Sequence, residues 1–180
     1  MNKSVKAGAP ILITMGEPSG IGPEVALAAF DHLGGKIGSH PLTLVGDAGV
    51  FAARQDALIA TGSPVKAVPG KPSSANAAAV TEAIEIAVKA CMDGDAAAIV
   101  TAPIHKSVLN AAGFAFPGHT EFLAHLTGVR RAVMMLASDQ LRVVPLTIHI
   151  RIADVPRAID KQSVFDTGEI ILTEIGKAHV

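Results

Sequence analysis

Residues 10–30 read PILITMGEPSGIGPEVALAAF, and this stretch decides the fold class. Residues 10–15 are a short apolar run typical of a strand, and a loop rich in Gly, Pro and Ser follows it. Pro23 then stands at the first position of a predicted helix with an acid in its first turn, and Gly34 and Gly35 lie beyond its end. The stretch therefore predicts a strand, a loop and a helix in succession.

The same alternation continues along the chain. Asp47 is placed to cap a helix that runs to about Ala60, and Ser74 is placed to cap a long Ala-rich helix closed by Asp93 and Gly94. Thr120 can cap a short helix in the same way. The helices predicted after the first one are 47–60, 74–92, 106–112, 121–126, 154–159 and a last one from about residue 164.

Five apolar runs are predicted to share one sheet. The continuous apolar character of residues 96–101 indicates a strand buried on both faces. Only Ser138, Asp139 and Gln140 separate the last two runs, which predicts a hairpin and so one antiparallel pair. We therefore expect a mixed, mostly parallel sheet between helices, an α/β layered sandwich. The runs are 10–15, 42–46, 96–101, 132–137 and 141–149, with a brief additional strand at 65–68.

Composition indicates a globular protein and excludes several classes. The 180 residues allow one domain or one and a half, and 49% hydrophobic against 17% charged residues is too apolar for disorder. The net charge of −1 leaves no basic excess for nucleic acid. No apolar run reaches the ~20 residues that span a bilayer, and the single cysteine, Cys91, fits a reducing compartment. We expect a cytoplasmic protein with neither a nucleic-acid nor a membrane partner.

Gly16 to Gly22 joins the first strand to the first helix, where α/β proteins place ligands. The glycine spacing matches neither the dinucleotide fingerprint nor the Walker A motif. Glu17 and Glu24 also put negative charge where a phosphate would sit. Two interpretations stay open: a tight turn that needs unusual backbone angles, or one wall of a ligand cleft.

Lys106 ends the segment TAPIHK, residues 101–106, at another junction of strand and helix. A lysine at a helix N-terminus opposes the helix dipole, and a bound anion or carboxylate would explain it. Lys106 is therefore a candidate catalytic residue. An ordinary surface lysine is the alternative.

Two histidines stand at predicted element ends. His119 and Thr120 lie at the tip of a turn directly before a helix, a position equally compatible with a plain surface histidine. His149 ends a predicted strand and is a candidate metal ligand. No other ligand type lies at H-x-H or H-x-x-x-H distance from it, so a metal site would need residues from distant parts of the chain or from another chain. A half-buried structural histidine is the alternative at position 149.

Four segments together resemble the N-terminal half of the 4-hydroxythreonine-4-phosphate dehydrogenase family of vitamin B6 synthesis. They follow the family's order and spacing over roughly residues 10 to 160. The segments are ITMGEPSGIGPE (13–24), TAPIHK (101–106), FPGHTE (116–121) and the stretch from His149 through Pro156.

The resemblance implies an oxidoreductase that uses NAD, or NADP, on a small phosphorylated hydroxy acid, 4-phosphooxy-threonine, in pyridoxine phosphate biosynthesis. Oxidation of the alcohol is followed by decarboxylation, with Zn, Mg or Mn polarising the alcohol and then the ketone. Substrate contacts are implied at His119 and Thr120, and a metal ligand at His149. The implied fold is a three-layer α/β/α sandwich similar to isocitrate and isopropylmalate dehydrogenases, in a homodimer with shared active sites.

The length departs from the family, whose members are close to twice as long. Residues 1–180 are therefore expected to be the N-terminal portion of a two-subdomain dehydrogenase without its C-terminal half. His179 does not match the family's second metal motif, so we expect the isolated chain to be inactive and to bind no divalent cation tightly. Two alternatives stay open: a related four-carbon acid sugar phosphate dehydrogenase, and a non-catalytic truncated half that binds ligand or dimerises.

Overall fold

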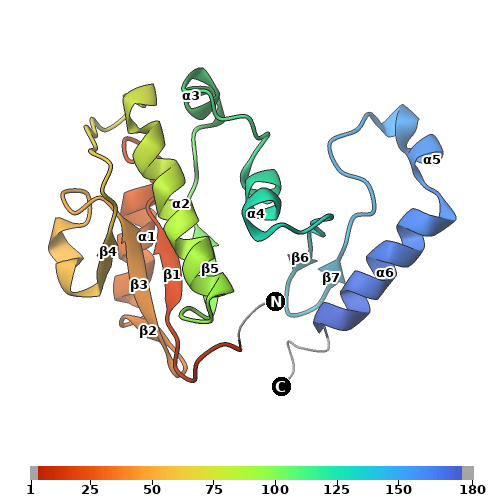
Figure 1. Ribbon diagram of the computed structural model, residues 1–180, viewed down its shortest axis with the longest axis horizontal. Coiled ribbons are helices and arrows are strands. Elements are labelled where there is room, and N and C mark those ends of the chain that lie inside the picture. Colours follow the sequence, from red (N-terminus) through yellow and green to blue (C-terminus); the bar gives the residue numbers. More distant parts are fainter. Residues whose placement is uncertain (1–3, 176–180) are drawn as a thin grey trace. The chain divides into compact units, whose positions relative to one another are not determined.

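The computed structural model describes residues 4–175 (Figure 1). The chain forms two compact units, Met1–Gly128 and Val129–Val180, which are described separately here. His179 lies outside the described residues.

A mixed sheet organises the first unit, in the order β2-β3-β1-β5, with β4 also paired to β3. Strand β1 lies between β3 and β5 and is parallel to both. The mixed, mostly parallel character is thus confirmed, but its antiparallel member is β2 rather than the predicted hairpin. The strands are β1 (Ile11–Thr14), β2 (Lys36–Ile37), β3 (His40–Gly46), β4 (Leu58–Ala60) and β5 (Ala98–Thr101).

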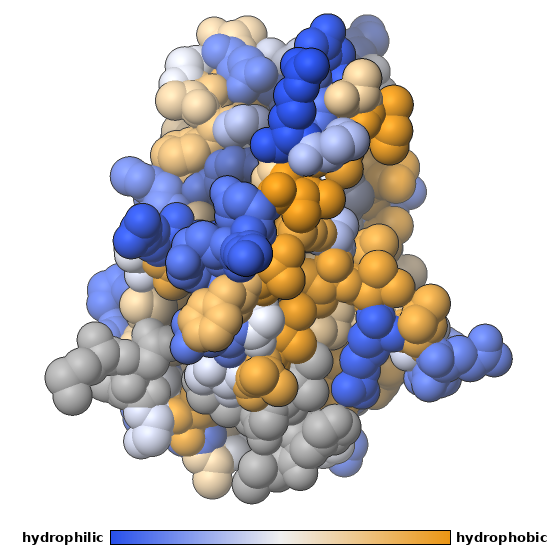
Figure 2. Space-filling model, turned by 90° about the vertical axis from the view of Figure 1, so that its right-hand side faces the viewer, coloured by the Kyte–Doolittle hydropathy of each residue, from blue (hydrophilic) through white to orange (hydrophobic). Residues whose placement is uncertain are grey.

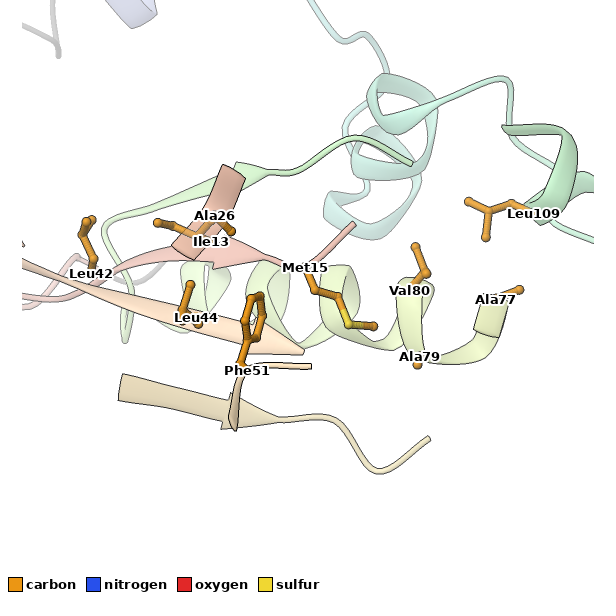
Figure 3. Packing of buried hydrophobic residues seen from close by; sticks show 10 residues of the cluster. All are labelled: Ile13, Met15, Ala26, Leu42, Leu44, Phe51, Ala77, Ala79, Val80 and Leu109. Carbon is orange, nitrogen blue, oxygen red and sulfur yellow. The ribbon is translucent and has the colours of Figure 1, made fainter. Parts of the chain in front are cut away.

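Helices cover both faces of this sheet. Alternation along β1 points Ile13 to one face, where it packs with Ala26 of α1 (Gly22–His32). Leu12 points to the other face and packs with Ala83 and Ala87 of α2 (Ala77–Met92). Figure 3 shows Ile13 beside Ala26 in this core.

The edge strand β5 is not buried on both faces, contrary to the prediction. Ile99 packs in the clusters beside α2, whereas Val100 points the opposite way and is 49% exposed. In the described part of the chain β5 pairs only with β1, so it is an edge strand of the sheet.

The segment after β3 differs from the predicted helix 47–60. The Asp47 side chain does accept hydrogen bonds from the N–H groups of Gly49 and Val50, as a cap would. The chain then forms only a 3-10 helix, Ala52–Ala57, and returns to the sheet as β4, because Leu58 aligns with Leu44 of β3. The predicted strand at 65–68 is absent as well.

Two helix starts are displaced from the predicted caps. Ser73, rather than Ser74, caps a 3-10 turn, Ser74–Asn76, that leads into α2. Helix α4 (His119–Thr127) begins two residues before the predicted Glu121, with Gly118 as its N-cap. Thr120 is therefore inside the first turn and not the cap. Helix α3 (Lys106–Ala111) lies where it was predicted.

The second unit has little regular sheet. Strands β6 (Leu136–Ala137) and β7 (Arg142–Val143) form an antiparallel pair, so the predicted hairpin is confirmed only over two residues on each side. They make a sheet of their own, and the prediction that they join the main sheet is wrong. Pro145, which has no N–H to donate, follows the short ladder. The helical elements are a 3-10 turn (Ile152–Asp154), α5 (Val155–Ala158) and α6 (Lys161–Ile175).

Apolar side chains of the second unit stay at the surface. Ile152 is 87% exposed and Leu172 of α6 is 79% exposed. Figure 2 shows apolar side chains gathered over the face that it displays. No helix in residues 4–175 has both the length and the apolar character to span a membrane.

Candidate functional site

The loop from Gly16 to Gly22 leaves β1 at the carboxyl edge of the sheet and packs on the segment that leaves β5. Gly16 has φ +64°, and a Cβ there would lie 2.4 Å from the carbonyl oxygen of Pro103. The Glu17 N–H donates to the same oxygen at 2.9 Å. The tight-turn interpretation is therefore confirmed, and the turn holds two of the family-like segments together.

Two buried polar side chains hold this loop: Glu17, noted above for its charge, and Ser19, which the sequence did not mark as a candidate. The buried Glu17 carboxylate accepts a hydrogen bond from the Ser19 N–H at 3.1 Å. The buried Ser19 hydroxyl accepts from the Val68 N–H at 3.2 Å, and its carbonyl accepts from the Gly70 N–H at 2.8 Å. The signal in the sequence is a Ser and a Glu inside a Gly-rich loop, where such side chains commonly bond to nearby backbone.

Helix α4 is fixed to the body of the first unit by an aromatic cluster. Phe122 is buried and packs with Ile84 and Val88 of α2. Its ring also lies edge-on to Phe114, with the centroids 5.0 Å apart. The first turn of α4, which carries His119 and Thr120, therefore has a defined position.

Lys106 reaches this first turn. It opens α3, and its Nζ and Cε lie 3.3 Å from the position that a Cβ on Gly118 would take. Glu121 borders the same point, with Oε2 3.6 Å from it. Lys106 is exposed and belongs to none of the ion pairs among the described residues. The structure thus brings together two of the predicted site residues.

His119 is about half buried, and its Nε2 atom is buried with no hydrogen-bond partner among the described residues. Burial lowers the pKa of the imidazole, and the charge of Lys106 lowers it further. His119 is therefore uncharged near neutral pH and keeps a free ring nitrogen. Such a group is suited to exchange a hydrogen bond or a proton with a ligand.

His149 does not have its predicted setting. It lies in an irregular bend of the second unit, not at a strand end, and it is exposed. Its φ of +58° makes it the one described residue other than glycine with positive φ. His149 belongs to the second unit and His119 to the first, and the roles implied for the two histidines stay predictions.

The described residues do not by themselves fit a divalent cation. No group of three or more His, Cys, Asp or Glu side chains within residues 4–175 is close enough together to hold one. His149 supplies one imidazole, whereas a catalytic metal normally has about three protein ligands.

A family profile described as pyridoxal phosphate biosynthetic protein PdxA matches residues 37–179. The chain belongs to the PdxA family. A 4-hydroxythreonine-4-phosphate dehydrogenase from Roseobacter denitrificans is 50% identical over 173 residues, which are 85% of this chain and 52% of the relative. The chain thus spans about half the length of such curated relatives.

Solved structures agree with this PdxA assignment. A 4-hydroxythreonine-4-phosphate dehydrogenase from Burkholderia phymatum superposes with a TM-score of 0.80 at 32% identity, covering 97% of this chain and 60% of that one. A putative enzyme of the same name from Salmonella typhimurium gives a TM-score of 0.78 at 26% identity, covering 96% and 61%. The α/β fold with a mixed sheet is therefore the fold of PdxA proteins over this part of their length.

Proposed function

We propose that this chain is the N-terminal portion of a dehydrogenase that oxidises and decarboxylates 4-phosphooxy-threonine in pyridoxine phosphate biosynthesis. Membership of the PdxA family and the names of the relatives support this proposal. We further propose the arrangement of isocitrate and isopropylmalate dehydrogenases, a three-layer α/β/α sandwich in a cytoplasmic homodimer with shared active sites.

The observation that carries the proposal is the first turn of α4. There the buried Nε2 of His119 has no hydrogen-bond partner among the described residues, and the Lys106 ammonium reaches the adjacent Gly118 and lowers the pKa of His119. A phosphorylated hydroxy acid offers both a hydroxyl and anionic oxygens. The Lys106 ammonium can pair with an anionic oxygen, and the uncharged imidazole can exchange a hydrogen bond with the hydroxyl.

Each residue then has a distinct part. His119 binds the substrate through its free ring nitrogen, and the hydroxyl of Thr120, one position along the same turn, is the second contact. Lys106 attracts the anionic substrate and remains the candidate catalytic residue. The substrate's position is fixed because Phe122 holds the turn on α2.

NAD, or NADP, would accept the hydride, and no described residue is assigned to it. A zinc, magnesium or manganese ion would supply Lewis acidity if His149 were joined by ligands from outside the described residues. We propose that the 180-residue chain alone neither binds such an ion tightly nor turns over substrate, because one imidazole is too few ligands.

A second candidate function is favoured by one relative. A putative D-threonate 4-phosphate dehydrogenase from Bradyrhizobium diazoefficiens is 38% identical over 175 residues, which are 83% of this chain and 50% of the relative. His119 and Thr120 do not distinguish an amino from a hydroxyl group beside the carboxylate. A four-carbon acid sugar phosphate is therefore the alternative substrate, and a non-catalytic half that binds ligand or dimerises is the alternative role.

Calorimetric titration with each of the two phosphorylated acids would test the site directly. We expect binding by the purified chain, weakened about tenfold or more by His119→Gln, because the hydrogen bonds of the free ring nitrogen are lost. His32→Gln, at an exposed position on α1, is the matched control.

Activity is tested separately by NADH absorbance, with the chain alone and mixed with the part of the Roseobacter relative beyond the matched region. Activity only in the mixture would support the dehydrogenase proposal, and comparison of the two substrates would choose between them. Equal binding by wild type and His119→Gln would remove His119 from the site. Binding without activity in the mixture would favour the non-catalytic half.

A further inference from the structure

Gly118 lies where Lys106 meets the start of α4. Its φ of −178° and ψ of −166° are an extended conformation that any residue adopts, so the backbone does not require glycine at this position. Gly118 is nevertheless buried, and an added Cβ would meet the end of the Lys106 side chain at 3.3 Å. The absence of a side chain at position 118 therefore matters for Lys106 rather than for the turn.

We propose that Gly118 is a positioning residue for Lys106, because its missing side chain lets the Lys106 ammonium lie against the first turn of α4 and share one oxyanion of the substrate with His119. This inference rests on the proposed function for the identity of the ligand. It makes Lys106 a direct contact of the substrate beside His119 and Thr120, and it gives Gly118 a role that acts through Lys106.

The contacts around Gly118 support a shared anion rather than an internal ion pair. Glu121 borders Gly118 but forms no ion pair with Lys106 within the described part of the chain. The His119 Nε2 atom is also without a partner there. Two groups that can bind an anion are thus held side by side, and neither is satisfied by a described residue.

Alanine at this position is a mild steric change. The atoms that a Cβ would approach are the far end of the flexible lysine and one carboxylate oxygen of Glu121, not backbone. We therefore expect Gly118→Ala to fold and to shift the end of the Lys106 side chain by a few tenths of an ångström. Gly118→Ala moves the Lys106 charge, whereas Lys106→Met removes it.

The first test is an NMR titration of His119 in the ligand-free chain. Lys106 is the charged group that acts on the ring, and Glu121 borders the neighbouring Gly118. Gly118→Ala and Lys106→Met should each raise the His119 pKa part of the way to its ordinary value, since burial continues to lower it. The His119 pKa of the double variant should equal that of Lys106→Met, and the His119 pKa of Lys106→Arg should equal that of wild type. Lys71→Met is the control for the loss of an exposed lysine.

The second test uses inorganic phosphate and acetate as probes, followed by the same His119 resonance. We expect an anion to bind wild type and Lys106→Arg, and to bind Lys106→Met about tenfold more weakly, as for one lost charge-assisted hydrogen bond. Gly118→Ala keeps the charge and should bind with an affinity between those of wild type and Lys106→Met. Preference for phosphate or for acetate shows whether the substrate's phosphate or its carboxylate occupies the site.

Several results would overturn the inference. If the His119 pKa is the same in Gly118→Ala as in wild type but is raised in Lys106→Met, Gly118 does not position Lys106. A wild-type titration in Lys106→Met, a failure of Gly118→Ala to fold, or no binding of either probe to wild type would each overturn it as well. These readouts need no turnover, so a negative dehydrogenase assay would refute the proposed function and leave this test intact.

Discussion

The two units of this chain differ in how far their apolar side chains are buried. In the first unit Leu12, Leu44 and Val45 are fully buried between α1 and α2. In the second unit Ile152 and Leu172 are largely exposed, and Thr167 is the one side chain described as buried. Hydrophobic residues thus build a core only where the topology brings a covering element, and parallel strands with crossover helices provide one.

Paired truncations should show the largest effect of this difference. Leu12→Ala removes a side chain with no exposed area that packs with Val45 and Ala83, and it should lower the free energy of unfolding by about 2–5 kcal/mol. Leu172→Ala, at 79% exposure, should change it by no more than about 0.5 kcal/mol. Denaturant unfolding of the intact chain measures both. Equal losses would mean that Leu172 is covered in solution, for example by a second copy of the chain.

The parts of the fold that could be predicted are those with local and repeated signals. Strand β1, the loop after it and α1 follow from Pro23 and the flanking glycines, and α2 follows from its Ala spacing. Strand β4 could not be distinguished from a helix, since its three residues owe their conformation to pairing with β3. The hairpin strands were predicted too long because apolar character alone does not say where a ladder ends.

A second comparison uses two glycines of the first unit that share a positive φ. Gly16→Ala would force φ near +64° and place a Cβ 2.4 Å from the Pro103 oxygen, so we expect a loss of roughly 2–4 kcal/mol. Gly34 has φ +62° and no atom within 4 Å of an added Cβ, so Gly34→Ala should lose only the cost of the left-handed backbone conformation, about 1 kcal/mol. Thermal and denaturant unfolding would measure both. Similar losses would show that the close approach of Gly16 to the Pro103 carbonyl does not add to the cost of the substitution.

The candidate site was predicted only residue by residue. The junction positions of Lys106 and His119 marked them as candidates, but their proximity follows from the packing of α4 on α2 through Phe122, which no local pattern reports. The role of Gly118 could not be predicted from local sequence either, because Lys106, which lies next to it in space, is twelve positions away in the chain. The bend at His149 was missed because the residues before it resemble a strand.

The charge at the α4 turn predicts a smaller, pH-dependent effect in the first unit. The folded-state pKa of His119 is lowered, so the unfolded chain binds more protons and the free energy of unfolding falls as pH drops below the ordinary value of about 6.5. In Lys106→Met the pKa rises and this fall should shrink. Because His119 is only half buried, solvent screening keeps the difference below about 1 kcal/mol.

Denaturant unfolding from pH 7.5 to 5 would measure this dependence. The lowered pKa values of Glu82 and Asp160 act at lower pH, because ordinary carboxyl groups titrate near 4. Their contribution is present above that range and is lost as pH falls through it. His119→Gln should remove the slope between pH 7 and 5 that belongs to His119, and an unchanged slope would assign it to another group.

Two surface ion pairs, one in each unit, should show the smallest effects. Arg54 donates from Nε and Nη2 to one oxygen of Asp31, at 3.0 and 2.7 Å, and its guanidinium lies 6.0 Å from the centre of the Phe30 ring. Arg54→Ala should therefore cost about 0.5–1 kcal/mol. Arg151 pairs with Asp154 three positions along at 2.8 Å, but its side chain is 85% exposed, so Arg151→Ala should cost less than about 0.5 kcal/mol. Unfolding in low salt and in high salt measures both, because added salt screens exposed charges and leaves the ring contact of Arg54 largely intact. A larger loss of unfolding free energy in Arg151→Ala than in Arg54→Ala would mean that surface charges stabilise the second unit more than the first. The second unit has few buried side chains, which would account for that result.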